Sequence, residues 1–183
     1  MSYREYVKDP RITESYLRWQ MAKFSVEMFI NPETPKKVNR DIKALLSTLR
    51  IPDENPIYLM FTHRSAEYLN GFCFQNCENE KDKIECEIIY GWSLWEDRKN
   101  EFFEAEFHSV IKENGVLIDI TPRRKNEERI LFVPDMSRIS GRKSIDSWYS
   151  WSNLKMVSCN VVEASEELEV VRLDAERSEF RKV

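Results

Sequence analysis

The chain has 183 residues, with 28 Lys and Arg against 32 Asp and Glu, and its formal net charge at pH 7 is −4. A hydrophobic content of 42% with only 4 Gly and 7 Pro argues against a disordered or fibrous chain, and the length suits a single domain over residues 1–183. The weakly acidic balance, without a long block of one sign, argues against nucleic acid as a partner. No stretch approaches the roughly 20 apolar residues of a membrane span, and the N-terminus lacks the apolar core of a secretory signal. We therefore expect a cytoplasmic protein with no membrane partner.

The first fifty residues are expected to be mostly helical. Asp9–Pro10 can cap and open a helix, and apolar residues at three- and four-residue steps predict an amphipathic helix over 10–30. Thr34–Pro35 repeats this pattern, and apolar residues on one face from Val38 to Leu49 predict a second helix. We expect both helices to pack on the core; the alternative is an appendage that binds a partner.

The rest of the chain predicts a sheet. A helix over 71–83 is followed by runs of aromatic and β-branched residues separated by turn-forming residues, which is typical of antiparallel strands. The expected strands are 84–95, 102–112, 116–121, 129–133 and 148–162. Residues 134–146 are expected to form a loop, and 163–183 a charged tail that edges onto the core and frays at its end. The predicted fold class is α+β, with N-terminal helices packed on an antiparallel β-sheet.

One predicted hairpin brings a histidine close to an aspartate. Asn114–Gly115 between alternating strands indicates a two-residue turn, which pairs Glu113 with Val116. In this register one face is almost wholly apolar, whereas the other carries His108 and Asp119 as diagonal neighbours about 7–8 Å apart. An imidazole and a carboxylate at that separation can form a hydrogen bond, which would fix the tautomer of His108 and stabilise its charged form, as a general base requires.

A nucleophile for such a base is available in the helix predicted over 71–83. Cys73 falls in its first turn, where the N-terminal partial positive charge favours ionisation of a thiol. Cys77 lies one turn later and competes with Cys73 for this role. Both thiols could instead be small buried core residues, and His108 could be a simple surface histidine.

The order of these motifs resembles the transglutaminase-like thiol enzymes of the papain-like fold. Gly71-Phe72-Cys73, then Phe107-His108-Ser109-Val110, then Asp119-Ile120-Thr121-Pro122 occur in that order, and the resemblance spans residues 70–122. It implies a transglutaminase-like core in which Cys73 is the nucleophile, His108 the base and Asp119 the orienting carboxylate. The implied activity is thiol-dependent acyl transfer at an amide of a protein or peptide, without a cofactor: a peptidase, an amidase or deamidase, or a transglutaminase. The sequence departs from this family in having no aromatic residue directly after His108.

Other residues allow different functions. Trp92 and Trp95 could line a substrate cleft, or could belong to a non-catalytic module that binds a protein. The basic segments 123–125 and 138–143 are expected to be solvated loops. Cys86 and Cys159 lie in strand-like runs, and we expect both to pack in the core.

A metal site is a further alternative, in two forms. One is a zinc site made of Cys73, Cys77, Cys86 and His108. The other uses Glu104, Glu106 and His108 on one strand face with Asp119 beside them, an oxygen-rich set suited to a harder cation or to iron.

Overall fold

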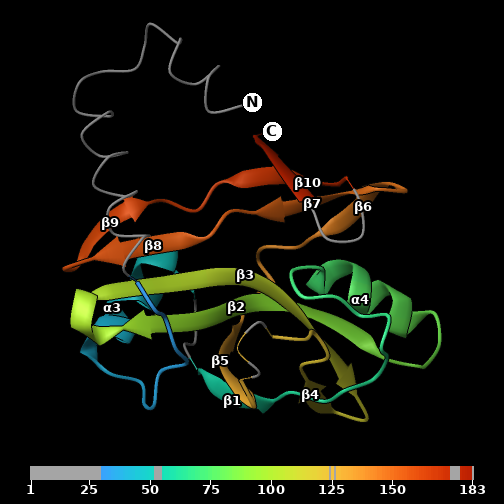
Figure 1. The fold of residues 1–183 in the computed structure, drawn as a ribbon, viewed down its shortest axis with the longest axis horizontal. Helices are drawn as coiled ribbons and strands as arrows, with labels where there is room; N and C mark the ends of the chain where they lie inside the picture. The colour runs from blue at the N-terminus through green and yellow to red at the C-terminus, as the bar shows by residue number, and fades with distance from the viewer. Residues whose placement is uncertain (1–29, 52–54, 124, 126, 174–177, 183) are drawn as a thin grey trace, which may run out of the picture.

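The computed structural model describes residues 30–51, 55–123, 125, 127–173 and 178–182, and these form two antiparallel sheets with helices packed on the larger one (Figure 1). This arrangement belongs to the α+β class. The helix expected over 10–30 lies outside the described residues. Within the described part of the chain, no helix has the length and apolar character needed to cross a bilayer.

The larger sheet is organised around two long central strands, β2 (Glu87–Asp97) and β3 (Phe102–Glu113), which pair along their whole length. A short 3-10 helix, η1 (Arg98–Asn100), joins them. The strand order is β1-β5-β2-β3-β8-β9, and β4 pairs with the end of β3. The outer strands are β1 (Ile57–Met60), β5 (Arg129–Pro134), β8 (Leu154–Val157), β9 (Asn160–Glu163) and β4 (Val116–Ile118).

The smaller sheet was not expected from the sequence. Its strand order is β11-β10-β7-β6, with bounds Ser178–Lys182, Glu167–Arg172, Ser147–Trp151 and Gly141–Ser144. The run expected to be one strand over 148–162 is divided among β7, β8 and β9, the expected loop contains β6, and the charged tail supplies β10 and β11. The smaller sheet contacts the helix over Cys73–Lys81 through Glu78 of that helix. The Glu78 carboxylate accepts hydrogen bonds from Trp148 Nε1 of β7 at 3.1 Å and from Arg142 of β6.

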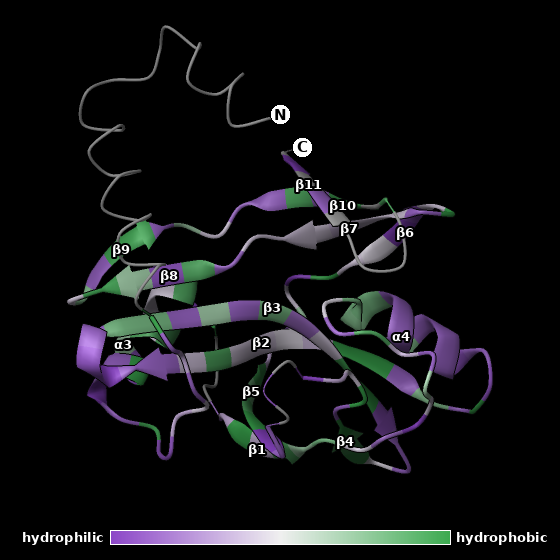
Figure 2. Cartoon of the chain, viewed as in Figure 1, coloured by the Kyte–Doolittle hydropathy of each residue, from purple (hydrophilic) through white to green (hydrophobic). Residues whose placement is uncertain are grey.

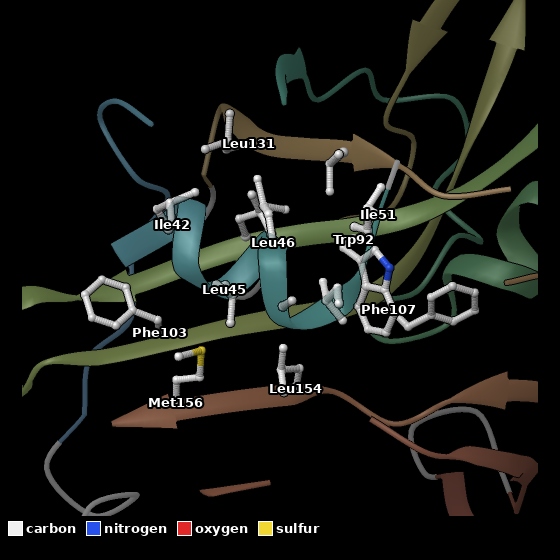
Figure 3. Close-up of a cluster of buried hydrophobic side chains, with 14 residues drawn as sticks. Ile42, Leu45, Leu46, Ile51, Trp92, Phe103, Phe107, Leu131, Leu154 and Met156 are labelled. Carbon is white, nitrogen blue, oxygen red and sulfur yellow. The ribbon is translucent and has the colours of Figure 1, made fainter. Parts of the chain in front are cut away.

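The helix α3 (Arg40–Leu49) supplies much of the main hydrophobic core. Asn39, rather than Thr34, caps it, with Oδ1 accepting from the amides of Asp41 and Ile42. Its apolar face packs on β2, β3, β5 and β8 (Figure 3). The buried residues of this face are Ile42, Leu45, Leu46 and Leu49. Burial of this stripe explains why the helical spacing was visible in the sequence.

The second helix, α4 (Cys73–Lys81), is short and mostly hydrophilic (Figure 2). It lies where a helix was expected over 71–83, and it contacts β3 and β2. Its buried positions include Cys77, which joins Ile111 and Ile120 in a small apolar cluster. On β3, α4 packs against Ile111 through Cys77 and against Phe107 through Phe74. Phe107 also belongs to the core under α3, so both helices cover the same face of the large sheet.

The predicted hairpin register is confirmed. Asn114 and Gly115 form the turn with φ of 50° and 81°, and Glu113 pairs with Val116. Positive φ at both positions is what a two-residue turn of this hand requires, and it favours Asn followed by Gly. The strand is shorter than the one expected over 116–121, because β4 ends at Ile118 and Asp119 forms a bridge with Phe61 instead.

Candidate active site

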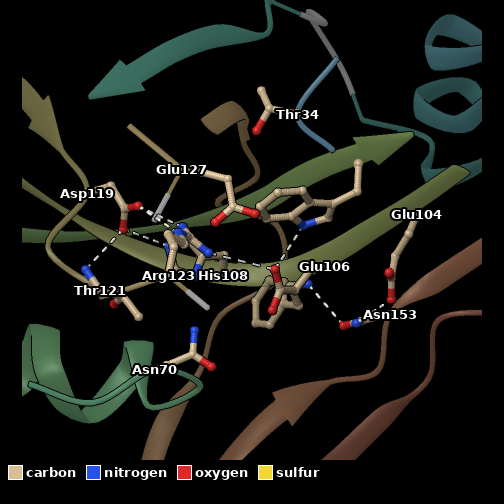
Figure 4. A network of polar contacts seen from close by, with 12 residues as sticks. Thr34, Asn70, Glu104, Glu106, His108, Asp119, Thr121, Arg123, Glu127 and Asn153 are labelled. Carbon is tan, nitrogen blue, oxygen red and sulfur yellow. Dashed lines mark hydrogen bonds and ion pairs between the residues drawn. The ribbon is translucent and has the colours of Figure 1, made fainter. Parts of the chain in front are cut away.

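His108 and Asp119 meet as the hairpin register predicts. Nε2 of His108 lies 3.0 Å from Oδ1 of Asp119, and both side chains are almost completely buried, with exposed fractions of 2% and 1% (Figure 4). The backbone of Asp119 is held separately, because its carbonyl accepts from Thr62 N at 2.8 Å. Oδ1 also accepts from Thr121 N at 3.2 Å, so the carboxylate has little freedom to turn away from the ring.

A third member of this group, Arg123, was not expected from the sequence. Its Nη2 and Nε donate to Oδ2 of Asp119 at 2.7 and 3.2 Å, and Nη2 lies 3.0 Å from His108 Nε2. The side chain is only 6% exposed, whereas the sequence predicted a solvated basic loop over 123–125. Burial of a guanidinium requires a buried partner of opposite charge, and Asp119 is that partner.

The N-terminus of α4 is tied to the segment that carries Asp119. Asn76, 3% exposed, donates to Thr121 Oγ1 at 3.3 Å and to the carbonyl of Leu69 at 2.9 Å. Asn70 donates to the carbonyl of Pro122 at 2.8 Å (Figure 4). These contacts hold the start of the helix, and therefore Cys73 as its first residue, beside the segment that follows β4. Sequence reasoning did not find Asn76 or Thr121 because their contact joins residues far apart in the chain.

The charge of Cys73 acts on the buried histidine. The pKa of His108 is raised to about 9, even though burial of the ring, the largest influence, lowers it. Cys73 contributes most to the rise, Arg123 opposes it and Asp119 adds to it. A raised pKa makes the imidazolium the favoured form of His108 at neutral pH.

The Asp119 carboxyl is kept ionised in the same network. Burial alone would raise its pKa, but His108 and Arg123 outweigh that effect and lower the pKa below its usual value. A carboxylate that stays charged next to the ring favours the protonated imidazole. The charges of His108, Asp119 and Arg123 therefore depend on one another.

The structure separates the two thiols that compete for the nucleophile role. Cys77 is fully buried, and its Sγ accepts a hydrogen bond from Ser109 Oγ at 3.4 Å. Burial raises the pKa of Cys77 well above its usual value, so its thiolate is disfavoured. Cys73 is 7% exposed and occupies the first position of α4. Both thiols are buried, and Cys73 is the less deeply buried of the two.

The two tryptophans predicted to contact substrate have different surroundings. Trp92 is fully buried in the main core, and its Nε1 donates to Asp135 Oδ2 at 2.9 Å, which leaves none of its ring exposed to a substrate. Trp95 is 9% exposed, and its Nε1 donates to Glu106 Oε2 at 2.9 Å. The Arg123 guanidinium lies 5.7 Å from its ring centroid, so Trp95 supports the buried ion pair.

The carboxylates proposed as metal ligands have other partners. Glu104 Oε1 accepts from Asn153 Nδ2 at 2.8 Å and lies 4.0 Å from Lys155 Nζ, whereas Glu106 pairs with Trp95 and Arg123. Across the described ranges, no three or more His, Cys, Asp or Glu side chains are grouped so as to hold a metal ion.

The two remaining thiols differ in their surroundings, because Cys86 packs against the apolar cluster that contains Cys77 whereas Cys159 does not reach the core. Cys86 is half-buried ahead of β2, and burial raises its pKa. Cys159 is exposed at the turn between β8 and β9, with φ of 63°, so the expectation that it packs in the core is wrong. Positive φ explains its position, because the tight turn places the residue outside the sheet.

Comparison of the chain with known proteins finds no matching family model, no matching curated protein and no matching solved structure.

Proposed function

We propose that the protein catalyses thiol-dependent acyl transfer at an amide bond, with Cys73 as the nucleophile, His108 as the base and Asp119 as the orienting carboxylate. The observation that carries this proposal is the buried His108–Asp119 hydrogen bond of 3.0 Å in a site where the charge of Cys73 raises the pKa of the ring. A histidine held by a carboxylate in this way can serve as the base that activates a thiol nucleophile.

The hydrogen bonds indicate which nitrogen of His108 would act on the thiol. Because Asp119 and Arg123 both lie at Nε2, this atom is engaged and Nδ1 is the nitrogen left for proton transfer. We assign the Nε2–H tautomer to neutral His108, since a carboxylate can only accept a hydrogen bond. Nδ1 then takes the proton of Cys73 and later returns it.

The start of α4 supports the charge that develops in such a reaction. The first amides of a helix have no intrahelical acceptor, and the N-cap Phe72 has no side-chain oxygen with which to satisfy them. The helix dipole adds a partial positive charge at the same end. The amides of the first turn are therefore suited to stabilise the oxyanion formed when Cys73 attacks a carbonyl.

The reaction proceeds in two balanced steps. Cys73 sulfur forms a bond to the carbonyl carbon, the carbon–nitrogen bond breaks, and His108 passes the thiol proton to the departing amine or ammonia. Water or a second amine then attacks the thioester, gives up a proton to His108, and releases the thiolate. Water yields hydrolysis of a peptide or side-chain amide, and an amine yields a new amide link. The substrate class we propose is an amide of a protein or peptide.

We also propose that residues 70–122 form a transglutaminase-like core. The support is the order of parts: a helix beginning with the nucleophile, a strand bearing the base, and a hairpin that returns the carboxylate to it. An enzyme of this kind needs a reduced thiol, which fits a cytoplasmic setting.

Native alkylation with iodoacetamide tests the proposal directly. The full-length protein is labelled between pH 5 and 9, and each thiol is followed by peptide mapping in the wild type and in His108→Ala. We expect Cys73 to react fastest near neutral pH and to lose that reactivity without His108, because the imidazolium no longer stabilises the thiolate. Ser109→Ala, which removes the hydrogen bond to Cys77 Sγ and keeps His108, is the matched control and should leave labelling of Cys73 unchanged.

The same experiment distinguishes the competing function, a module that binds a protein without chemistry. The observation that favours this alternative is the burial of the group, with Cys73 7% exposed. If Cys73 labels no faster than the fully buried Cys77 until the protein unfolds, or if His108→Ala leaves its rate unchanged, the acyl-transfer mechanism is wrong.

A further inference from the structure

Arg123 makes contacts that exceed what a buried counter-ion needs. Two of its nitrogens donate to the same oxygen of Asp119, Oδ2, which leaves Oδ1 for the ring of His108. A planar guanidinium that donates twice to one carboxylate restricts rotation of that group, which a single ammonium does not.

Arg123 is itself held from two further sides. Its guanidinium lies 5.7 Å from the ring centroid of Trp95, and Nη1 lies 3.9 Å from Glu106 Oε2 (Figure 4). Trp95 Nε1 in turn donates to the same oxygen of Glu106. The guanidinium is thus held in place, and its two hydrogen bonds to Oδ2 hold the Asp119 carboxylate in place as well.

The nitrogen of His108 that meets Asp119 also meets Arg123. When Nε2 carries a proton, it donates to Oδ1 and cannot accept from Nη2 at 3.0 Å, so the N–H groups of Arg123 remain directed at Oδ2. The groups in contact with the ring are Asp119 and Arg123 after β4 and the uncharged Phe132 ring of β5, and Cys73 of α4 also acts on its charge. Arg123 is the positive charge in this set, and it opposes the effect of Cys73 and Asp119.

We propose that Arg123 is a positioning residue that locks the Asp119 carboxylate against Nε2 of His108 and thereby fixes the orientation of the imidazole ring. This inference rests on the proposed function, because orientation of the ring matters only if Nδ1 exchanges a proton with the thiol. Arg123 also prevents His108 from holding its proton too tightly, since its charge lowers the pKa of the ring. A base must give up the proton it has taken when the amine departs.

Nitrogen-15 NMR of the histidine side chains tests this inference without a substrate. The chain has 2 histidines, and His63→Gln identifies the signal of His108. In the wild type we expect the neutral ring as the Nε2–H tautomer. In Arg123→Met we expect the pKa of His108 to rise by about one pH unit or more, because a neighbouring positive charge is removed. Lys112→Met removes an exposed positive charge from β3, the strand that carries His108, and it should leave the titration of His108 unchanged.

Arg123→Lys separates position from charge. It keeps the positive charge but not the double contact, so we expect the pKa of His108 to stay near that of the wild type. Alkylation of Cys73 by iodoacetamide at pH 7 should nevertheless slow by about tenfold or more in both Arg123 variants, because the ring is no longer fixed. Circular dichroism establishes that each variant is folded, and the lysine variant remains informative if Arg123→Met does not fold.

The outcomes distinguish this inference from the proposed function. If Arg123→Met leaves the tautomer and titration of His108 unchanged, or if Arg123→Lys alkylates at the wild-type rate, Arg123 does not position the ring. If Cys73 lacks selective reactivity in the wild type, the proposed function fails instead, and a mechanistic role for Arg123 fails with it whatever the NMR result.

Discussion

Replacing Asp119 by Asn should destabilise the protein far more than loss of an ordinary surface carboxylate. The side chain is 1% exposed, and it accepts from His108, from the amide of Thr121 and twice from Arg123. Asparagine keeps the shape but loses the charge, and its NH2 group is directed at another donor. Arg123, 6% exposed, then has no buried partner of full opposite charge.

Removing one partner of a buried ion pair costs about 3–5 kcal/mol of the free energy of unfolding. For a chain of this length, 1 kcal/mol corresponds to about 2–4 °C in Tm, so Asp119→Asn should lower Tm by roughly 6–20 °C. Glu87→Gln is the control, because Glu87 is 69% exposed and its pairing with Lys112 at 3.5 Å should contribute less than about 1 kcal/mol.

Urea unfolding followed by circular dichroism measures both values and allows a double-mutant cycle. Asp119→Asn combined with Arg123→Met should cost less than the sum of the two single changes, by about 0.5–3 kcal/mol, because no unpaired charge remains buried. The reasoning is refuted if Asp119→Asn costs no more than Glu87→Gln, or if the double variant is strictly additive.

Three further predictions concern the ring and two glycines. A pKa of about 9 in the folded protein against a reference of 6.5 means that His108 stabilises the fold fully below pH 6.5 and loses this contribution as pH rises through 9. The stability difference between wild type and His108→Gln, measured by urea unfolding, should therefore shrink from pH 6 to pH 10; a constant difference contradicts the prediction. Gly91→Ala should cost several kcal/mol by the same assay, because the new Cβ would lie 2.2 Å from the Val133 carbonyl oxygen, whereas Gly141→Ala has open space and should be neutral within about 0.5 kcal/mol. Gly115→Ala should lower the free energy of unfolding by about 1–2 kcal/mol, since φ at this position is +81°. An unchanged midpoint of urea unfolding would contradict this prediction.

The parts of the site that sequence could predict are those fixed by local rules. Asn114 and Gly115 admit few turn geometries, and once the turn is placed, period-two alternation brings His108 to Asp119 without knowledge of the rest of the fold. The start of α4 was equally local, because Asn70–Gly71 ended the preceding segment and Cys73 followed.

The parts that sequence could not predict depend on burial and on contacts between distant segments. Arg123 lies in a run of basic residues, and nothing in that run distinguishes a buried guanidinium from a solvated one. The difference in burial between Cys73 and Cys77 could not be predicted either, since both lie in the same helix. The strand β10 could not be predicted because its sequence is rich in charged residues. Leu168 and Val170 are buried in a strand that pairs with β7 and β11, which are distant or equally charged segments of the chain.

The contact between Glu78 and the smaller sheet makes the C-terminal strands a mechanical support for the helix that carries Cys73. Trp148 and Arg142 both donate to the Glu78 carboxylate in the middle of α4, and β7 is held in turn by β10. Loosening of β10 would free β7, and the helix would lose an anchor on the side away from Asn76. Hydrogen exchange in α4 should therefore rise together with exchange in β7 and β10, so that the order of the thiol depends on residues a hundred positions further along the chain.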